Sequence, residues 1–157
     1  MKPTVYIETS VVSYLTARPS RDLIVAGHRQ VTAEWWRTVL PEISAFVSEL
    51  VLEEASKGDE QAAAQRLERI ADMPVLEVVD EIDGLAKEYA DALQLPDKAQ
   101  ADAYHMALAT WHGIDYVVSW NCTHIASGRV QRVLLEINSA IGFQTPILCT
   151  PEELMEV

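Results

Sequence analysis

The sequence predicts an α/β domain in which helices cover both faces of a mostly parallel β-sheet. Short apolar runs rich in β-branched residues alternate along the chain with longer segments of helical periodicity, and parallel strands need such crossover helices between them. Hydrophobic residues make up 49% of the 157 residues, which is enough for a sizeable core. No repeat, low-complexity tract or flexible linker divides the chain, so we expect a single domain over residues 1–157.

The first half of the chain is expected to begin with a strand and a short helix. Residues 5–7 are Val-Tyr-Ile, a composition typical of a buried strand, and the polar pair Thr9 and Ser10 can cap a helix that begins near Ser10. The long segment before Pro41 has helical spacing and no internal proline. The other expected elements in this half are a helix at 21–40, a strand at 44–47, and helices at 49–57 and 59–70.

The second half repeats the alternation of strands and helices. Leu95 and Pro96 separate two helical segments, and Gly113 ends the second of them. The expected elements are a strand at 75–79, helices at 81–93 and 98–112, a strand at 116–118, a helix at 127–141, a strand at 146–149 and a helical turn after Pro151.

The strongly acidic composition limits the ways in which the chain could bind nucleic acid. Its formal net charge is −12, whereas a general phosphate-binding surface needs clustered Lys and Arg. Two alternatives remain open. Either the partners are not polyanions, or a metal ion and a few local arginines overcome the repulsion at one site.

Cysteine content and hydropathy indicate the compartment. Cys122 and Cys149 are too few to staple a fold of this size, and neither has the spacing of a zinc site, so we expect reduced thiols in a cytoplasmic protein. The N-terminus has no long apolar segment, and no run of about eighteen apolar residues could span a bilayer. We therefore expect neither secretion nor a membrane partner.

Polar side chains gather after the predicted strands. Glu8 directly follows the first strand, and Asn121 closely follows the strand at 116–118. Glu54 lies about one and a half turns into the helix after the second strand, and Asp102 lies near the start of the helix before strand 116–118. Because α/β proteins bind ligands beyond the carboxyl ends of parallel strands, we expect these four side chains to share one crevice.

Asp102 is the most informative of these acids. Ala99, Met106 and Ala109 lie at helical spacings of three and four residues from it, so its carboxylate shares an apolar face. A carboxylate on such a face needs a partner, and a divalent cation is one that offsets the cost of burial. An Asp near a helix N-terminus can equally act as a cap, and Glu8 has the same alternative role before the first helix.

Together the acids favour one kind of chemistry. Carboxylate ligands without Cys or paired His suit Mg²⁺ or Mn²⁺ better than zinc. Such a cation lowers the pKa of bound water and stabilises charge on a phosphoryl oxygen, so phosphodiester hydrolysis is the natural reaction. The sequence contains no Ser-His-Asp order, phosphate-binding P-loop or glycine-rich dinucleotide turn that would favour another reaction.

Four segments together resemble the PIN-domain family, and within it the toxins of the VapC type. They are Ile-Glu-Thr-Ser at 7–10, Ser-Glu-Leu-Val-Leu-Glu-Glu at 48–54 leading to Gly58, Asp-Ala-Tyr-His-Met-Ala-Leu-Ala at 102–109, and Ser-Trp-Asn at 119–121. The resemblance implies a three-layer α/β/α fold and an endoribonuclease that depends on Mg²⁺ or Mn²⁺ and acts on RNA. It also implies a homodimer and, often, a small antitoxin protein that blocks the site.

The resemblance also assigns roles to the acids. It implies that Glu8, Glu54 and Asp102 bind the metal and that Asn121 completes the catalytic set. Spacing within the second motif favours Glu54 over Glu53, since adjacent helical residues point about 100° apart and such pairs are usually solvated. Glu8 and Asn121 depart from the family pattern, because both positions normally carry Asp. The neutral Asn121 would weaken or remove a second metal position, and a catalytically impaired binding or assembly module is therefore the alternative.

Four further residues are candidates for contact with RNA. They are Thr9, Ser119, His124 and Arg129. His124 lies three residues after Asn121 and could either bond the scissile phosphate or cap a helix. Arg129 could bind a phosphate, although ordinary helix-surface charge explains it as well.

Overall fold

The computed structural model of the chain describes residues 1–157 and contains one five-stranded sheet. The strands are β1 (Thr4–Ile7), β2 (Ser44–Ser48), β3 (Val75–Leu76), β4 (Tyr116–Val118) and β5 (Ile147–Cys149). Their order is β3-β2-β1-β4-β5, and every neighbouring pair is parallel. The predicted mostly parallel sheet is confirmed. Because β1 and β4 are neighbours, the residues that follow them emerge side by side.

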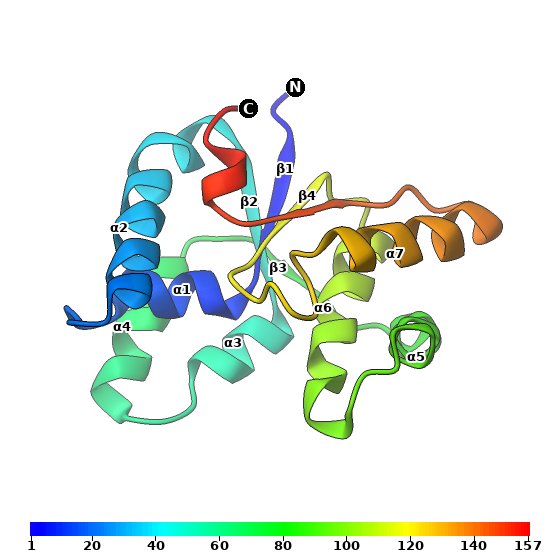
Figure 1. Cartoon of the computed structure of the whole chain (residues 1–157), viewed down its shortest axis with the longest axis horizontal. Helices are drawn as coiled ribbons and strands as arrows, with labels where there is room; N and C mark the ends of the chain where they lie inside the picture. Colours follow the sequence, from blue (N-terminus) through cyan, green and yellow to red (C-terminus); the bar gives the residue numbers. More distant parts are fainter.

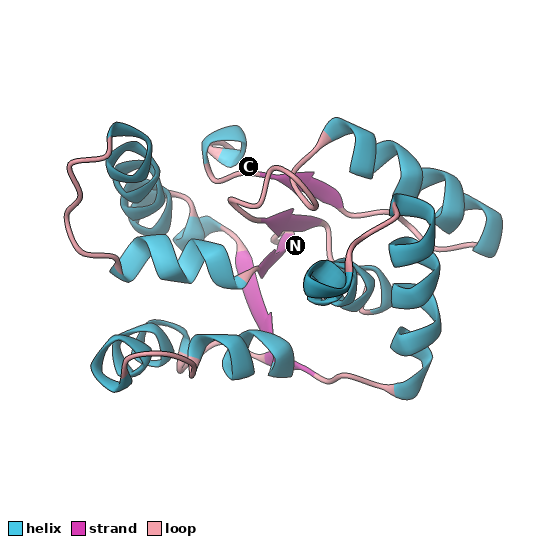
Figure 2. Cartoon of the chain, turned by 60° about the horizontal axis from the view of Figure 1, so that its bottom comes forward, coloured by secondary structure: helices cyan, strands magenta, loops and turns pink.

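Seven helices enclose the sheet from two sides, as a three-layer α/β/α fold requires. They are α1 (Thr9–Thr16), α2 (Leu23–Thr38), α3 (Glu49–Ala55), α4 (Glu60–Ile70), α5 (Asp80–Leu93), α6 (Gln100–Trp111) and α7 (Gly128–Ile141). Figures 1 and 2 show α1 to α4 gathered on one side of the strands and α5 to α7 on the other. Short 3-10 turns lie at Leu40–Glu42, Asp97–Ala99 and Glu152–Leu154. None of these helices has the length and apolar character needed to cross a membrane.

Strand β3 is shorter than the predicted strand at 75–79. Its last residue, Leu76, pairs with Ser48, and the chain of β2 turns into α3 at the next residue. No partner strand continues beyond that point. The backbone N–H of Val78 donates to the Glu49 carboxylate at 3.1 Å instead.

Two helix starts differ slightly from expectation. Helix α1 begins at Thr9 rather than near Ser10, because Glu8 is its N-cap and accepts a hydrogen bond from the Ser10 N–H. Helix α2 begins only at Leu23, where Asp22 accepts hydrogen bonds from the first backbone N–H groups. Side-chain acceptors therefore fix both starts more precisely than the apolar spacing does.

One continuous core of 33 buried residues supports the proposal of a single domain. The central strand β1 buries Val5, Tyr6 and Ile7 completely. Trp35 is also fully buried, and its indole N–H donates to the backbone oxygen of Leu154 at 2.9 Å, which attaches the C-terminal turn to α2.

A side chain covers the outer edge of β5. Gln131 on α7 donates its amide N–H to the Pro146 oxygen at 2.9 Å and accepts the Leu148 N–H at 2.8 Å. The side-chain amide thus takes the place that a sixth strand would occupy.

Candidate metal centre

Glu8 is fixed at the carboxyl end of β1. Glu8 is only 7% exposed, and it caps α1, which was the alternative role expected for it. Oε1 accepts the hydroxyls of Ser10 and Ser119, each at 2.5 Å, and Oε2 accepts the Ser10 N–H at 3.1 Å. Since Ser119 directly follows β4, these bonds join the ends of the two central strands through one carboxylate.

Glu54, and not Glu53, enters the same region. Its Oε1 accepts the Thr9 hydroxyl at 2.5 Å and lies 2.6 Å from Nε2 of His105. Helices α1, α3 and α6 therefore converge beside the end of β1 (Figure 1). Glu53 is 67% exposed and lies 4.0 Å from Lys57 on the surface.

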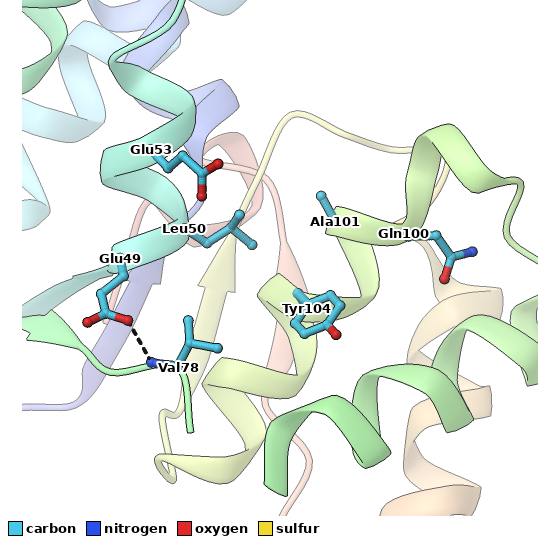
Figure 3. A pocket seen from close by; sticks show the side chains of 7 residues that line it. All are labelled: Glu49, Leu50, Glu53, Val78, Gln100, Ala101 and Tyr104. Atoms are coloured by element: carbon cyan, nitrogen blue, oxygen red, sulfur yellow. Dashed lines mark hydrogen bonds between the residues drawn. The ribbon is translucent and has the colours of Figure 1, made fainter. Parts of the chain in front are cut away.

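Glu53 borders a separate hollow of about 530 Å³ between α3 and α6. Figure 3 shows the side chains that line it: Glu49, Leu50, Glu53, Val78, Gln100, Ala101 and Tyr104. None of the four predicted catalytic residues is among them. The acids therefore do not lie in this hollow, although α3 and α6 carry residues of both.

Asp102 approaches from the first turn of α6. Its side chain is 18% exposed, and the Ala99, Met106 and Ala109 positions that share its helix face are buried, as their spacing predicts. Asp102 makes no capping hydrogen bond; its Oδ2 lies 3.0 Å from Nδ1 of His124. Burial raises the pKa of Asp102, polar contacts with the loop after β4 lower it in part, and the charge of Glu8 raises it further.

Asn121 shapes the loop after β4. Its Oδ1 accepts the backbone N–H of His124 at 2.9 Å, and its own N–H donates to the Ser119 hydroxyl at 2.9 Å. His124 does not cap α7, because Ser127 is the N-cap residue there. The loop therefore turns the His124 ring toward Asp102.

His105 is a site residue that no expectation named. It lies one turn after Asp102 on α6, is 1% exposed, and holds Glu54 through Nε2 and the Tyr6 hydroxyl through Nδ1 at 2.6 Å. Single ligand atoms of Glu8, Glu54 and His105 all lie within 4.8 Å of one another, while Asp102 is outside this group. A polar ring on a helix of otherwise buried Ala, Met and Leu residues was the signal that could have found it.

The partly exposed Glu54 and the buried His105 shift each other's pKa. Burial alone would raise the pKa of Glu54, but the hydrogen bond and charge of His105 and the Thr9 hydroxyl bring it below its usual value. Burial alone would lower the pKa of His105, but the hydrogen bond to Glu54 and the charges of Glu8, Glu54 and Asp102 raise it. Glu54 is therefore ionised at neutral pH.

The chemistry of the donors fits a divalent cation. Hydrogen bonds occupy Oε1 of Glu54 and Oδ2 of Asp102. Oε2 of Glu54 and Oδ1 of Asp102 make no hydrogen bond of ordinary geometry and are not buried, although the nearby Asn121 side chain lowers the pKa of Asp102. No Lys or Arg forms an ion pair with Glu8, Glu54 or Asp102. Glu54 and Asp102 each have a carboxylate oxygen to spare, and carboxylate oxygens are the ligands that Mg²⁺ and Mn²⁺ prefer.

The residues expected to contact RNA lie in different surroundings. Thr9 and Ser119 hydrogen-bond to the acids themselves, and Ser119 is fully buried. Arg129 is exposed in the first turn of α7, and no hydrogen bond or ion pair joins it to the acids. A contact of Arg129 with RNA stays a prediction.

Comparison with known proteins places this geometry in context. The family model described as PIN domain matches residues 5–121, a span that includes Glu8, Glu54, Asp102 and Asn121. One similar solved structure is VapC20 of Mycobacterium tuberculosis, described as a toxin that cleaves the sarcin-ricin loop. It is 17% identical, with a TM-score of 0.55, and the match covers 89% of this chain and 96% of that one. No curated protein matches the sequence. At this identity the structural likeness shows the fold.

Proposed function

Because the chain belongs to the PIN-domain family, we propose that it is a divalent-metal-dependent endoribonuclease and the toxin of a toxin–antitoxin pair. The observation that carries the proposal is the close approach of Glu8, Glu54 and His105 beside the end of the central strand, with Asp102 near enough for the charge of Glu8 to raise its pKa. No Lys or Arg forms an ion pair with these three acids. The description of VapC20 as a toxin that cleaves the sarcin-ricin loop supports RNA as the substrate class.

In this proposal Glu54 and Asp102 each have one anchored and one available oxygen, whereas both oxygens of Glu8 already accept hydrogen bonds. Glu54 and Asp102 would each offer their free oxygen to Mg²⁺ or Mn²⁺, and Glu8 would offer the remaining lone pair of Oε2. A bound cation lowers the pKa of water and stabilises charge on a phosphoryl oxygen. The hydroxyls of Thr9, Ser10 and Ser119 keep the carboxylates oriented.

RNA cleavage by the purified protein tests the proposal. We expect cleavage with Mg²⁺ or Mn²⁺ and none after chelation by EDTA, because hydrolysis needs the cation that the three carboxylates hold. Gel analysis of several structured and single-stranded RNAs would measure it. Absence of cleavage with both metals, across all of these RNAs, would contradict the enzyme assignment.

Asn121 is expected to limit the centre to one cation. Its amide brings no charge, so nothing relieves the repulsion that a second cation about 4 Å away would meet. We therefore expect Asn121→Asp to tighten Mn²⁺ binding by about tenfold, since an added carboxylate raises the charge of the ligand set. Asp can still accept the His124 N–H, so the loop is retained. Isothermal titration calorimetry with Mn²⁺ measures the change.

A charge control accompanies that variant. Thr123→Asp adds the same charge at an exposed position two residues away in the same loop. An equal gain in Mn²⁺ affinity for both variants would show a general electrostatic effect, and would contradict a direct role for position 121.

The second candidate is a catalytically silent domain used for binding or assembly. It is favoured by Asn121, whose carbonyl already accepts the His124 N–H, and by the net charge of −12. Calorimetry separates the two candidates, because a silent module needs no Mn²⁺ affinity. A wild-type protein that binds no Mn²⁺ would leave only this second function.

Partners and location follow from the same proposal. A small antitoxin, a homodimer and a cytoplasmic location with reduced Cys122 and Cys149 stay predictions. Size-exclusion chromatography with light scattering tests the dimer, and co-expression with a neighbouring small reading frame tests the antitoxin.

A further inference from the structure

A continuous chain of hydrogen bonds runs from the start of α3 to Glu54. Ser48, the N-cap residue of α3, accepts the Val51 N–H at 3.2 Å, and its hydroxyl lies 2.8 Å from the Tyr6 hydroxyl. Tyr6 lies 2.6 Å from Nδ1 of His105, whose Nε2 lies 2.6 Å from Glu54. Ser48, Tyr6 and His105 are at most 1% exposed, so water does not compete for these bonds.

The two ring nitrogens of His105 decide what the ring can do. The ionised carboxylate of Glu54 can only accept, so Nε2 carries the hydrogen. If the ring is neutral, Nδ1 accepts the Tyr6 hydroxyl; if the ring is charged, Tyr6 accepts from Nδ1 and turns its own hydrogen toward Ser48. No lone pair of His105 remains for a cation in either state. The ring therefore serves Glu54 as a donor, although it lies within ligand distance of the acids.

We propose that Ser48, Tyr6 and His105 are positioning residues that set the orientation of Glu54 for metal binding. This inference rests on the proposed function. His105 and the Thr9 hydroxyl both hold Oε1 of Glu54, which leaves Oε2 as the oxygen available to a cation. The hydrogen-bond chain from Ser48 through Tyr6 and His105 to Glu54, called the relay below, connects β1, α3 and α6. The packing of the core therefore fixes the direction of the Glu54 carboxylate.

Two variants interrupt the relay while keeping the space filled. We expect His105→Leu and Tyr6→Phe each to weaken Mn²⁺ binding by about ten- to a hundredfold, the usual effect of removing a residue that orients a metal ligand. kcat should fall while KM for RNA stays within about twofold, because neither side chain reaches the surface. His105→Gln retains an N–H donor and should restore part of the affinity. Calorimetry with Mn²⁺ and steady-state kinetics provide the readouts.

Tyr89→Phe is the matched control. Tyr89 is also fully buried, and its hydroxyl bonds Thr110 and Asn138 between α5, α6 and α7. Removing the Tyr89 hydroxyl should lower Tm about as much as Tyr6→Phe does, and Mn²⁺ affinity should stay unchanged. A folded His105→Leu protein that binds Mn²⁺ as tightly as the wild type would overturn the positioning role.

A metal-independent measurement keeps this inference separate from the proposed function. Nitrogen-detected NMR of the His105 ring should show a protected Nε2–H resonance that shifts in Glu54→Gln and in Tyr6→Phe. Failure of the wild type to bind Mn²⁺ with these shifts present would contradict the enzyme proposal and retain the relay. An Nε2–H resonance unchanged in both variants would contradict the relay.

Discussion

Asp102→Asn is expected to abolish RNA cleavage, with a loss on the order of 10²-fold or more, because it removes one of the three charges that we propose to hold the cation. The substitution keeps the size of the side chain and leaves a polar group facing His124. Burial raises the pKa of Asp102, polar contacts offset part of this rise, and the charge of Glu8 adds to it. Because the pKa is higher in the folded state than in the unfolded state, the ionised carboxylate destabilises the metal-free fold at neutral pH. Tm should therefore stay unchanged or rise. RNA cleavage and Mn²⁺ calorimetry on the folded variant measure the effect.

Asp97→Asn is the control for that experiment. It makes the same chemical change at an exposed position in the turn before α6. Full activity in Asp97→Asn and none in Asp102→Asn is the expected pair. Wild-type Mn²⁺ affinity in Asp102→Asn would place the metal elsewhere.

Trp35→Ala should produce the largest loss of stability, about 3–5 kcal/mol, because it empties a large volume in the core. Trp35 is fully buried, and the variant also loses the hydrogen bond that attaches the C-terminal turn to α2. For a chain of this size, such a loss lowers Tm by on the order of 10 °C. Thermal unfolding followed by circular dichroism measures it.

The adjacent residue provides the control for Trp35. Trp36 packs against the edge of the core, is partly exposed, and makes no hydrogen bond through its indole N–H. Trp36→Ala should therefore cost much less. Equal Tm shifts for the two variants would contradict the conclusion that Trp35 is the tryptophan that stabilises the core and attaches the C-terminal turn to α2.

Most of the fold was predictable because its signals are local. The Val-Tyr-Ile segment of β1 predicts a strand, and Leu95-Pro96 predicts the end of a helix, each from a few neighbouring residues. The prediction was wrong where the outcome depended on another segment. β3 stops at Leu76 because its partner β2 ends at Ser48, and no property of residues 77–79 reveals that.

In the candidate site, too, the residues with local signals were predictable and those that depend on a distant segment were not. Glu8, Glu54, Asp102 and Asn121 could be named from motifs and from their places after strands. His105 could not be linked to Glu54, because 51 residues separate them and only the folded sheet brings α3 and α6 near enough for this hydrogen bond. The carboxylate of Glu8 caps α1 and also lies within 4.8 Å of ligand atoms of Glu54 and His105, so its capping role does not exclude the proposed role at the centre.

The carboxamide of Gln131 has a consequence for how copies of the chain can associate. Exposed sheet edges invite intermolecular strand pairing, which leads to aggregation. At β5 such pairing would first have to break both hydrogen bonds of Gln131, and at the opposite edge β3 offers only two residues. We therefore expect any dimer of this protein to form through side-chain surfaces rather than through a continuous intermolecular sheet.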